Sequence, residues 1–119
     1  MNQPTPDVAA HDVERVVRRD YPQESFESIM ALLNQYGTID WQREPDRVRL
    51  AALKNAGGSL TILTQQIELS QHDYRDVLAP AEYPGYTKKM FHIEKLSEAD
   101  RKNIVDNDWK QYEEWLNRK

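Results

Sequence analysis

The sequence predicts an all-α fold: a single-domain bundle of four to five helices, with a helix over 59–79 at its centre. Three observations predict this fold. Apolar residues recur at steps of three and four along several segments, glycine occurs only four times in 119 residues, and proline, glycine or serine bounds most of these segments. Such spacing places apolar side chains on one face of a helix. A chain of this length is expected to form one domain, here 1–119.

The N-terminal part predicts a short helix. Residues 1–5 are polar and are expected to form a disordered tail. Thr5-Pro6 is a typical helix start, because proline is favoured at the first helical position, and the helix should run to about Asp20. Three valines should form its inner face: Val13, Val16 and Val17.

Two further helices follow. A stripe of five residues predicts the second, which Gly37 should end: Phe26, Ile29, Met30, Leu33 and Tyr36. The third is expected to begin at Pro45 and to end before Gly57. Arg49 projects among the apolar residues of this third helix, and an unpaired buried charge is costly. We therefore expect Arg49 to have an acidic partner.

Ser59 is expected to cap the long helix over 59–79, which Pro80 should end. This segment is apolar on two sides, so we expect neighbouring helices on two sides. Residues 80–96 contain two prolines and a glycine and predict a loop. Ser97 should cap a last, aromatic helix over 97–117.

Composition argues against several classes of function. The net charge is −4 with a pI of about 5.4, so no broad positive field is present and we expect no nucleic-acid partner. The absence of cysteine excludes disulfides, thiolate nucleophiles and cysteine-rich zinc sites. No apolar run approaches the ~20 residues that span a bilayer, and the first residues lack the features of a signal peptide. We expect a cytoplasmic protein with no membrane contact.

One charged cluster stands out. Asp73 and Asp76 are three residues apart on the expected helix, so their carboxylates are neighbours. Arg49 is the obvious counter-charge, and we expect Arg49, Asp73 and Asp76 to form a structural ion cluster that fixes how two helices pack. The alternative is a small carboxylate- or metal-dependent hydrolase or lyase that uses Asp73, Asp76 and Glu82.

Metal binding has little support. His72 lies four residues from both Glu68 and Asp76, which can supply two ligands, but a site needs a third and a fourth. No HExxH segment, P-loop or GxSxG elbow is present. We expect no metal, no cofactor and no catalytic residue.

The favoured function is a non-enzymatic protein-interaction or regulatory accessory protein that docks an unidentified protein through the surface at 73–86. Large aromatics with polar tips dominate protein interfaces energetically, and loops commonly carry function. The expected partner-binding residues are Tyr74, Arg75, Glu82, Tyr83 and Tyr86. The aromatic residues of the last helix suit either a core or an interface between subunits, so this helix could fold over its own domain or exchange in a homodimer: Trp109, Tyr112 and Trp115.

Three segments also carry a resemblance to a known group of proteins. The strings LLNQYG, RVRLAALKNAGG and DYRDVLAPAEYP resemble the LLxxYG, RVRLAxLKxAxG and DYRDVLAxAEYP segments of a family of small uncharacterised bacterial proteins. The resemblance covers a little over half of the chain, from Tyr21 to Tyr86. It departs from the family pattern at Pro45 and at Pro80. It implies a bacterial, cytosolic helical protein and adds no mechanism.

Overall fold

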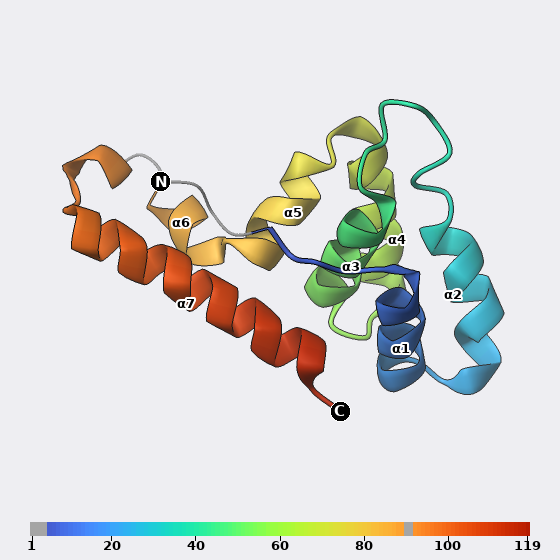
Figure 1. Cartoon of the computed structure of the whole chain (residues 1–119). Helices are drawn as coiled ribbons and strands as arrows, with labels where there is room; N and C mark the ends of the chain where they lie inside the picture. Colours follow the sequence, from blue (N-terminus) through green and yellow to red (C-terminus); the bar gives the residue numbers. More distant parts are fainter. Residues whose placement is uncertain (1–4, 90–91) are drawn as a thin grey trace.

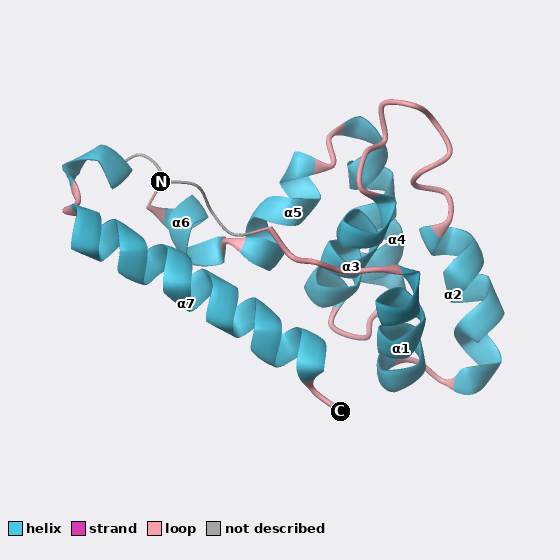
Figure 2. Ribbon diagram, in the orientation of Figure 1, coloured by secondary structure: helices cyan, strands magenta, loops and turns pink. Residues whose placement is uncertain are grey.

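A computed structural model describes residues 5–89 and 92–119. Within these ranges the chain forms helices joined by turns and loops, and no strand, which confirms the all-α bundle (Figures 1 and 2). The described residues form seven α-helices, where four to five were expected. The helices are α1 (Ala10–Asp20), α2 (Phe26–Leu33), α3 (Pro45–Ala56), α4 (Leu60–His72), α5 (Arg75–Glu82), α6 (Pro84–Lys88) and α7 (Glu98–Asn117). Two 3₁₀ turns, η1 (Gln23–Ser25) and η2 (Ile93–Lys95), precede α2 and α7.

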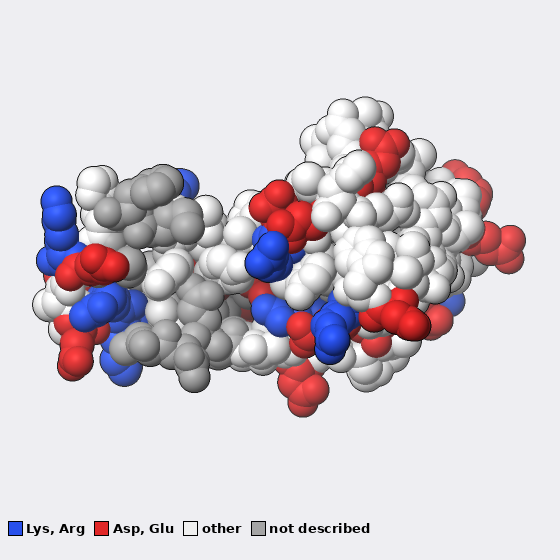
Figure 3. Space-filling view, turned by 90° about the horizontal axis from the view of Figure 1, so that it is seen from above, with Lys and Arg blue, Asp and Glu red and all other residues white. Residues whose placement is uncertain are grey.

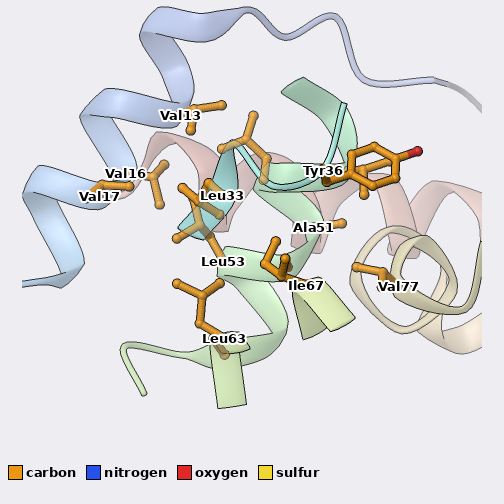
Figure 4. Packing of buried hydrophobic residues seen from close by; sticks show 14 of the residues in the cluster. Val13, Val16, Val17, Leu33, Tyr36, Ala51, Leu53, Leu63, Ile67 and Val77 are labelled. Atoms are coloured by element: carbon orange, nitrogen blue, oxygen red, sulfur yellow. The ribbon is translucent and has the colours of Figure 1, made fainter. Parts of the chain in front are cut away.

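The core is built around α3, which packs against α1, α4 and α5. Four consecutive residues of α3, from Leu50 to Leu53, are fully buried. Figure 4 shows their neighbours pointing toward one another from α1, α2, α4 and α5: Val13, Val16, Val17, Leu33, Leu63, Ile67 and Val77. Burial of each such aliphatic side chain stabilises the fold by roughly 1.5–3 kcal/mol. The centre of the bundle is therefore α3, and not the helix expected over 59–79.

The first helix begins later than predicted. It starts at Ala10, where Asp12 Oδ2 accepts a hydrogen bond from the backbone N–H of Ala9 at 3.0 Å. Thr5-Pro6 does not open the helix, because Pro6 is buried among other parts of the protein. Residues 5–9 instead form a segment without regular secondary structure, which we call the open segment. Residues 1–4 of the predicted tail lie outside the described residues.

The helix predicted over 59–79 is two helices with a break at Asp73. Asp73 has an extended backbone, and its Oδ1 accepts a hydrogen bond from the N–H of Arg75 at 3.0 Å. A side chain that bonds the backbone two residues ahead competes with continuation of a helix and favours the start of a new one. The prediction of one continuous helix is wrong for this reason.

The loop predicted over 80–96 is also partly helical. Helix α5 continues past the exposed Pro80 to Glu82, and α6 follows after one residue. Asp108 on α7 accepts hydrogen bonds from the N–H groups of Gly85 and Tyr86, at 2.8 and 3.0 Å, and so caps the start of α6. A residue 23 positions away in sequence provides this cap, which local sequence does not reveal.

The last helix has the predicted ends, because Ser97 Oγ accepts a hydrogen bond from the N–H of Asp100 at 3.1 Å. It lies along α6 and α5, and its C-terminal end lies near α1 (Figure 1). Arg19 on α1 fastens this end by donating to the carbonyls of Trp115 and Arg118, at 2.8 and 2.7 Å. Within residues 5–89 and 92–119, no helix has the length and apolar character needed to cross a membrane.

Candidate functional site

The expected ion cluster of Arg49, Asp73 and Asp76 does not form. Arg49 Nε and Nη2 donate to the carbonyl oxygens of Leu33 and Tyr36, at 3.1 and 2.6 Å. Asp73 instead pairs with its exposed neighbour Arg75 at 3.0 Å. Asp76 is exposed. The prediction is wrong because α4 ends at His72. Asp73 therefore has an extended backbone, and Asp76 lies on a different helix, α5.

Arg49 has a different role, which is to hold the end of α2. The last carbonyls of a helix lack intrahelical partners, and a cation there is also favoured by the helix dipole. Burial lowers the pKa of the Arg49 guanidinium, while Asp46 opposes that shift. The arginine thereby fixes the start of the loop at 34–44, which joins α2 to α3.

The loop at 34–44 is held by hydrogen bonds from within. The buried Gln42 accepts from three consecutive N–H groups, those of Gly37, Thr38 and Ile39, at 2.8, 3.0 and 3.2 Å. The hydroxyl of Tyr36 donates to the carbonyl of Arg43 at 2.9 Å. These bonds satisfy backbone groups that would otherwise need water, and they hold the loop at both ends.

This ordered loop exposes two large apolar side chains. Ile39 is 53% exposed and Trp41 is 45% exposed. The loop lies beside the start of α5, because the rings of Tyr36 and Tyr74 are 6.5 Å apart and Gln71 donates to the carbonyl of Gln35 at 3.4 Å. We call the loop at 34–44 together with the turn at 73–76 the loop end of the molecule. Figure 3, which views the molecule from above, shows a broad uncharged area on the right with acidic and basic side chains at its margins.

Arg47 and Glu82 form a buried ion pair that was not predicted from the sequence. Arg47 Nε and Nη2 donate to Glu82 Oε2 and Oε1 at 2.8 and 2.6 Å, and the Glu82 side chain is 5% exposed. Burial raises the pKa of the Glu82 carboxyl, while the hydrogen bonds from Arg47 oppose that shift. One sequence signal was present: Glu82 lies four residues after Leu78, on the buried side of α5.

The expected partner-binding residues lie in different environments. Arg75 is exposed at the loop end, and Tyr74 is half-buried against Tyr36. Glu82 is buried in its ion pair and is not available to a partner. Tyr83 and Tyr86 are half-buried where α6 meets α7. The 73–86 segment is therefore not one continuous docking surface.

The aromatic residues of α7 pack within the same chain. Tyr112 is 1% exposed, and Trp115 is half-buried and packs against the core. Trp109 is half-buried and lines a cavity of about 10 Å³ that it shares with Glu82 and Tyr112. The Tyr112 hydroxyl is buried without a hydrogen-bond partner among the described residues, and burial raises the pKa of this group.

The residues of the alternative enzyme do not come together. Asp73 and Asp76 lie on the loop end, whereas Glu82 is held by Arg47 at the other end of α5. Within the described parts of the chain, no group of three or more histidines and carboxylates is placed to hold a metal ion.

Comparison with known proteins adds no assignment: no family model, no curated protein and no solved structure matches this chain. The resemblance to small uncharacterised bacterial proteins stays a prediction.

Proposed function

We propose that this chain is a non-enzymatic, cytoplasmic interaction protein that docks another protein through its loop end. The observation that carries this proposal is the exposure of Ile39 and Trp41 on a loop that is fixed from within. Tyr74 and Arg75 of the adjoining turn, which the sequence also pointed to, extend the same surface.

The physical argument rests on the cost of ordering a binding loop. Association loses affinity when a mobile loop must be immobilised, so a loop already held in its bound shape binds more tightly. Tryptophan is the residue most enriched among those that dominate binding energy. An exposed tryptophan on a loop stabilised by Gln42, Tyr36 and Arg49 has both properties. The partner should present an apolar pocket that accepts the indole ring.

The test compares two matched pairs of exposed apolar residues. The wild-type protein, an Ile39→Ala/Trp41→Ala variant and a Leu60→Ala/Ile62→Ala variant serve as baits in lysate, with captured proteins identified by mass spectrometry. Leu60 and Ile62 are 53% and 40% exposed on α4, away from the loop end, so they control for general loss of apolar surface.

The captured protein is then purified and titrated against each bait by calorimetry. We expect the loop variant to bind at least roughly thirtyfold more weakly, the loss typical of a dominant interface residue, and the α4 variant to bind like wild type. Equal binding by all three folded baits, or no specific capture by wild type, would contradict docking through the loop end.

A further inference from the structure

The open segment at 5–9 crosses the front of α3 and reaches the place where α5 meets α7 (Figure 1). Pro6 is buried there, whereas its neighbours Thr5 and Asp7 are exposed. A single proline is thus the residue that enters the protein, and the residues on either side of it remain at the surface.

The site that receives Pro6 is partly aromatic. Pro6 lines the cavity of about 10 Å³ together with Tyr83, Trp109 and Tyr112, and Glu82, Val105 and Asp108 complete its lining. It also lines an open groove of about 240 Å³ with Trp109 and Tyr112. We call these three residues, Tyr83, Trp109 and Tyr112, the aromatic cradle. Proteins that recognise proline-bearing segments commonly use grooves lined by aromatic rings, because the stiff pyrrolidine ring packs on them at little cost in entropy.

Apart from Pro6 and Val8, few contacts hold the segment. Residues 5–8 make no hydrogen bond to the rest of the chain as far as the structure describes it, and the first such bond is the one from Ala9 to Asp12. Val8 is half-buried and packs against the hydrophobic core. A segment held mainly by two side chains opens at lower free energy than the core does.

We propose that the aromatic cradle is a docking site for an extended, proline-bearing segment of a partner protein, which the chain's own residues 5–9 occupy as an internal competitor. The site is separate from the loop end and does not depend on the function proposed there. Only three residues, Asp7 to Ala9, join Pro6 to α1, so its effective concentration at the cradle is high. The apparent affinity for a partner segment therefore depends on the fraction of molecules in which residues 5–9 have left the cradle.

The experiment uses the full chain and a capped peptide with the sequence of residues 5–9, TPDVA. The control peptide is TSDVA, in which serine replaces the proline. Binding to wild type and to the Pro6→Ser variant is followed by NMR through the indole N–H signals of Trp109 and Trp41. The Trp41 signal reports on the loop end, so a failure of one proposal is seen apart from a failure of the other.

We expect TPDVA to shift the Trp109 signal and not the Trp41 signal, with an apparent affinity at least about tenfold higher for Pro6→Ser than for wild type, because the internal competitor is removed. TSDVA should cause no shift. Equal binding of the two peptides, or no gain in affinity on loss of Pro6, would overturn the proposal.

A second variant covers the case in which Pro6→Ser does not fold. Asp12→Ala removes the acceptor that holds Ala9 and loosens the segment while it keeps Pro6, so it should raise the affinity for TPDVA in the same direction. Sedimentation gives an independent check. A wild-type dimer that becomes monomeric on Pro6→Ser would overturn docking of a partner in favour of exchange of residues 5–9 between two copies.

Discussion

Arg47 and Glu82 form a buried ion pair with two parallel hydrogen bonds, and the pair joins the first turn of α3 to the last turn of α5. Glu44 adds a third bond to the same guanidinium, at 2.8 Å from Nη1. The pairing raises the pKa of Arg47 above its usual range, so the charge persists at every accessible pH. Because the Glu82 carboxylate is almost fully buried, Arg47 is the residue that compensates the cost of burying its charge.

Replacement of Arg47 by alanine should therefore lower the free energy of unfolding by about 3–5 kcal/mol, because it leaves a carboxylate buried without its partner. Denaturant unfolding at neutral pH measures the loss. Arg75→Ala is the matched control, since it breaks the exposed pair with Asp73 and should leave the unfolding midpoint unchanged. Similar midpoints for the two variants would show that the Arg47–Glu82 pair contributes little.

Arg49 and Asp73 should be energetically independent. Arg49→Met should destabilise the protein by about 2–3 kcal/mol, because the carbonyls of Leu33 and Tyr36 lose a charged donor. In a double-mutant cycle with Asp73→Ala, the two effects should add, as expected for residues that do not interact. A clear coupling energy would instead support an interaction between Arg49 and Asp73, as the sequence suggested.

Gly37 should tolerate alanine less well than Gly57. Gly37 has a φ of +104°, and a Cβ there would lie 2.8 Å from Pro45 Cβ and 2.9 Å from Arg49 Nη2. We expect Gly37→Ala to cost about 1–3 kcal/mol from backbone strain, with the close contacts adding to it. Gly57, with a φ of +57° and open space around it, should lose only about 1–2 kcal/mol. Thermal unfolding of both variants gives the order, and a reversed order would mean that the loop yields to the methyl group.

Two buried tyrosine hydroxyls should respond in opposite ways to removal. Tyr36→Phe loses the bond to the Arg43 carbonyl and should cost about 1 kcal/mol. Tyr112→Phe removes a buried hydroxyl that has no partner in the described chain, so stability should be equal or higher. Denaturant unfolding compares them. A loss at Tyr112 would indicate that a water molecule in the adjoining cavity, which has room for about one, bonds the hydroxyl.

Stability should fall in alkaline solution as Tyr36 loses its proton. Burial, with the nearby Tyr74 and Glu44, raises the pKa of Tyr36 from 10.0 to about 12. The folded state therefore holds this proton more tightly than the unfolded chain, and the resulting stability is present below pH 10 and lost as pH rises toward 12. The unfolding free energy measured across this range should decline less steeply for Tyr36→Phe. Parallel curves would exclude Tyr36 as the source.

Some helix ends with a local signal were predicted correctly, and others were not. Gly37 and Pro80 were expected to end helices, but α2 already ends at Leu33 and α5 continues past Pro80 to Glu82. Pro45, Gly57 and Ser97 bound α3 and α7 through their own backbone preferences or hydroxyl group. Pro6 has an equally good local signal, but the aromatic cradle buries it and the helix starts four residues later. The local sequence around Pro6 does not show that residues far away in the chain will bury it.

The candidate site shows the same division. The sequence indicated a buried arginine on α3 that needs a partner, but two arginines, Arg47 and Arg49, lie two positions apart on that helix. Arg47 reaches Glu82 because the break at Asp73 turns α5, whereas Arg49 donates to the carbonyls of Leu33 and Tyr36. Trp41 carried no periodic signal, because the bonds that order its loop come from a glutamine, a tyrosine and an arginine with no shared motif.

The bonds from Arg19 to Trp115 and Arg118 span 96 and 99 residues of sequence. Closing so long a loop is entropically costly, so contacts of this kind form after local ones. During synthesis, α1 to α5 can assemble while α7 is still being added, and Arg19 then has no carbonyl to bind. We therefore expect α7 to dock last. Its amide hydrogens should be among the first to exchange with solvent in the finished protein.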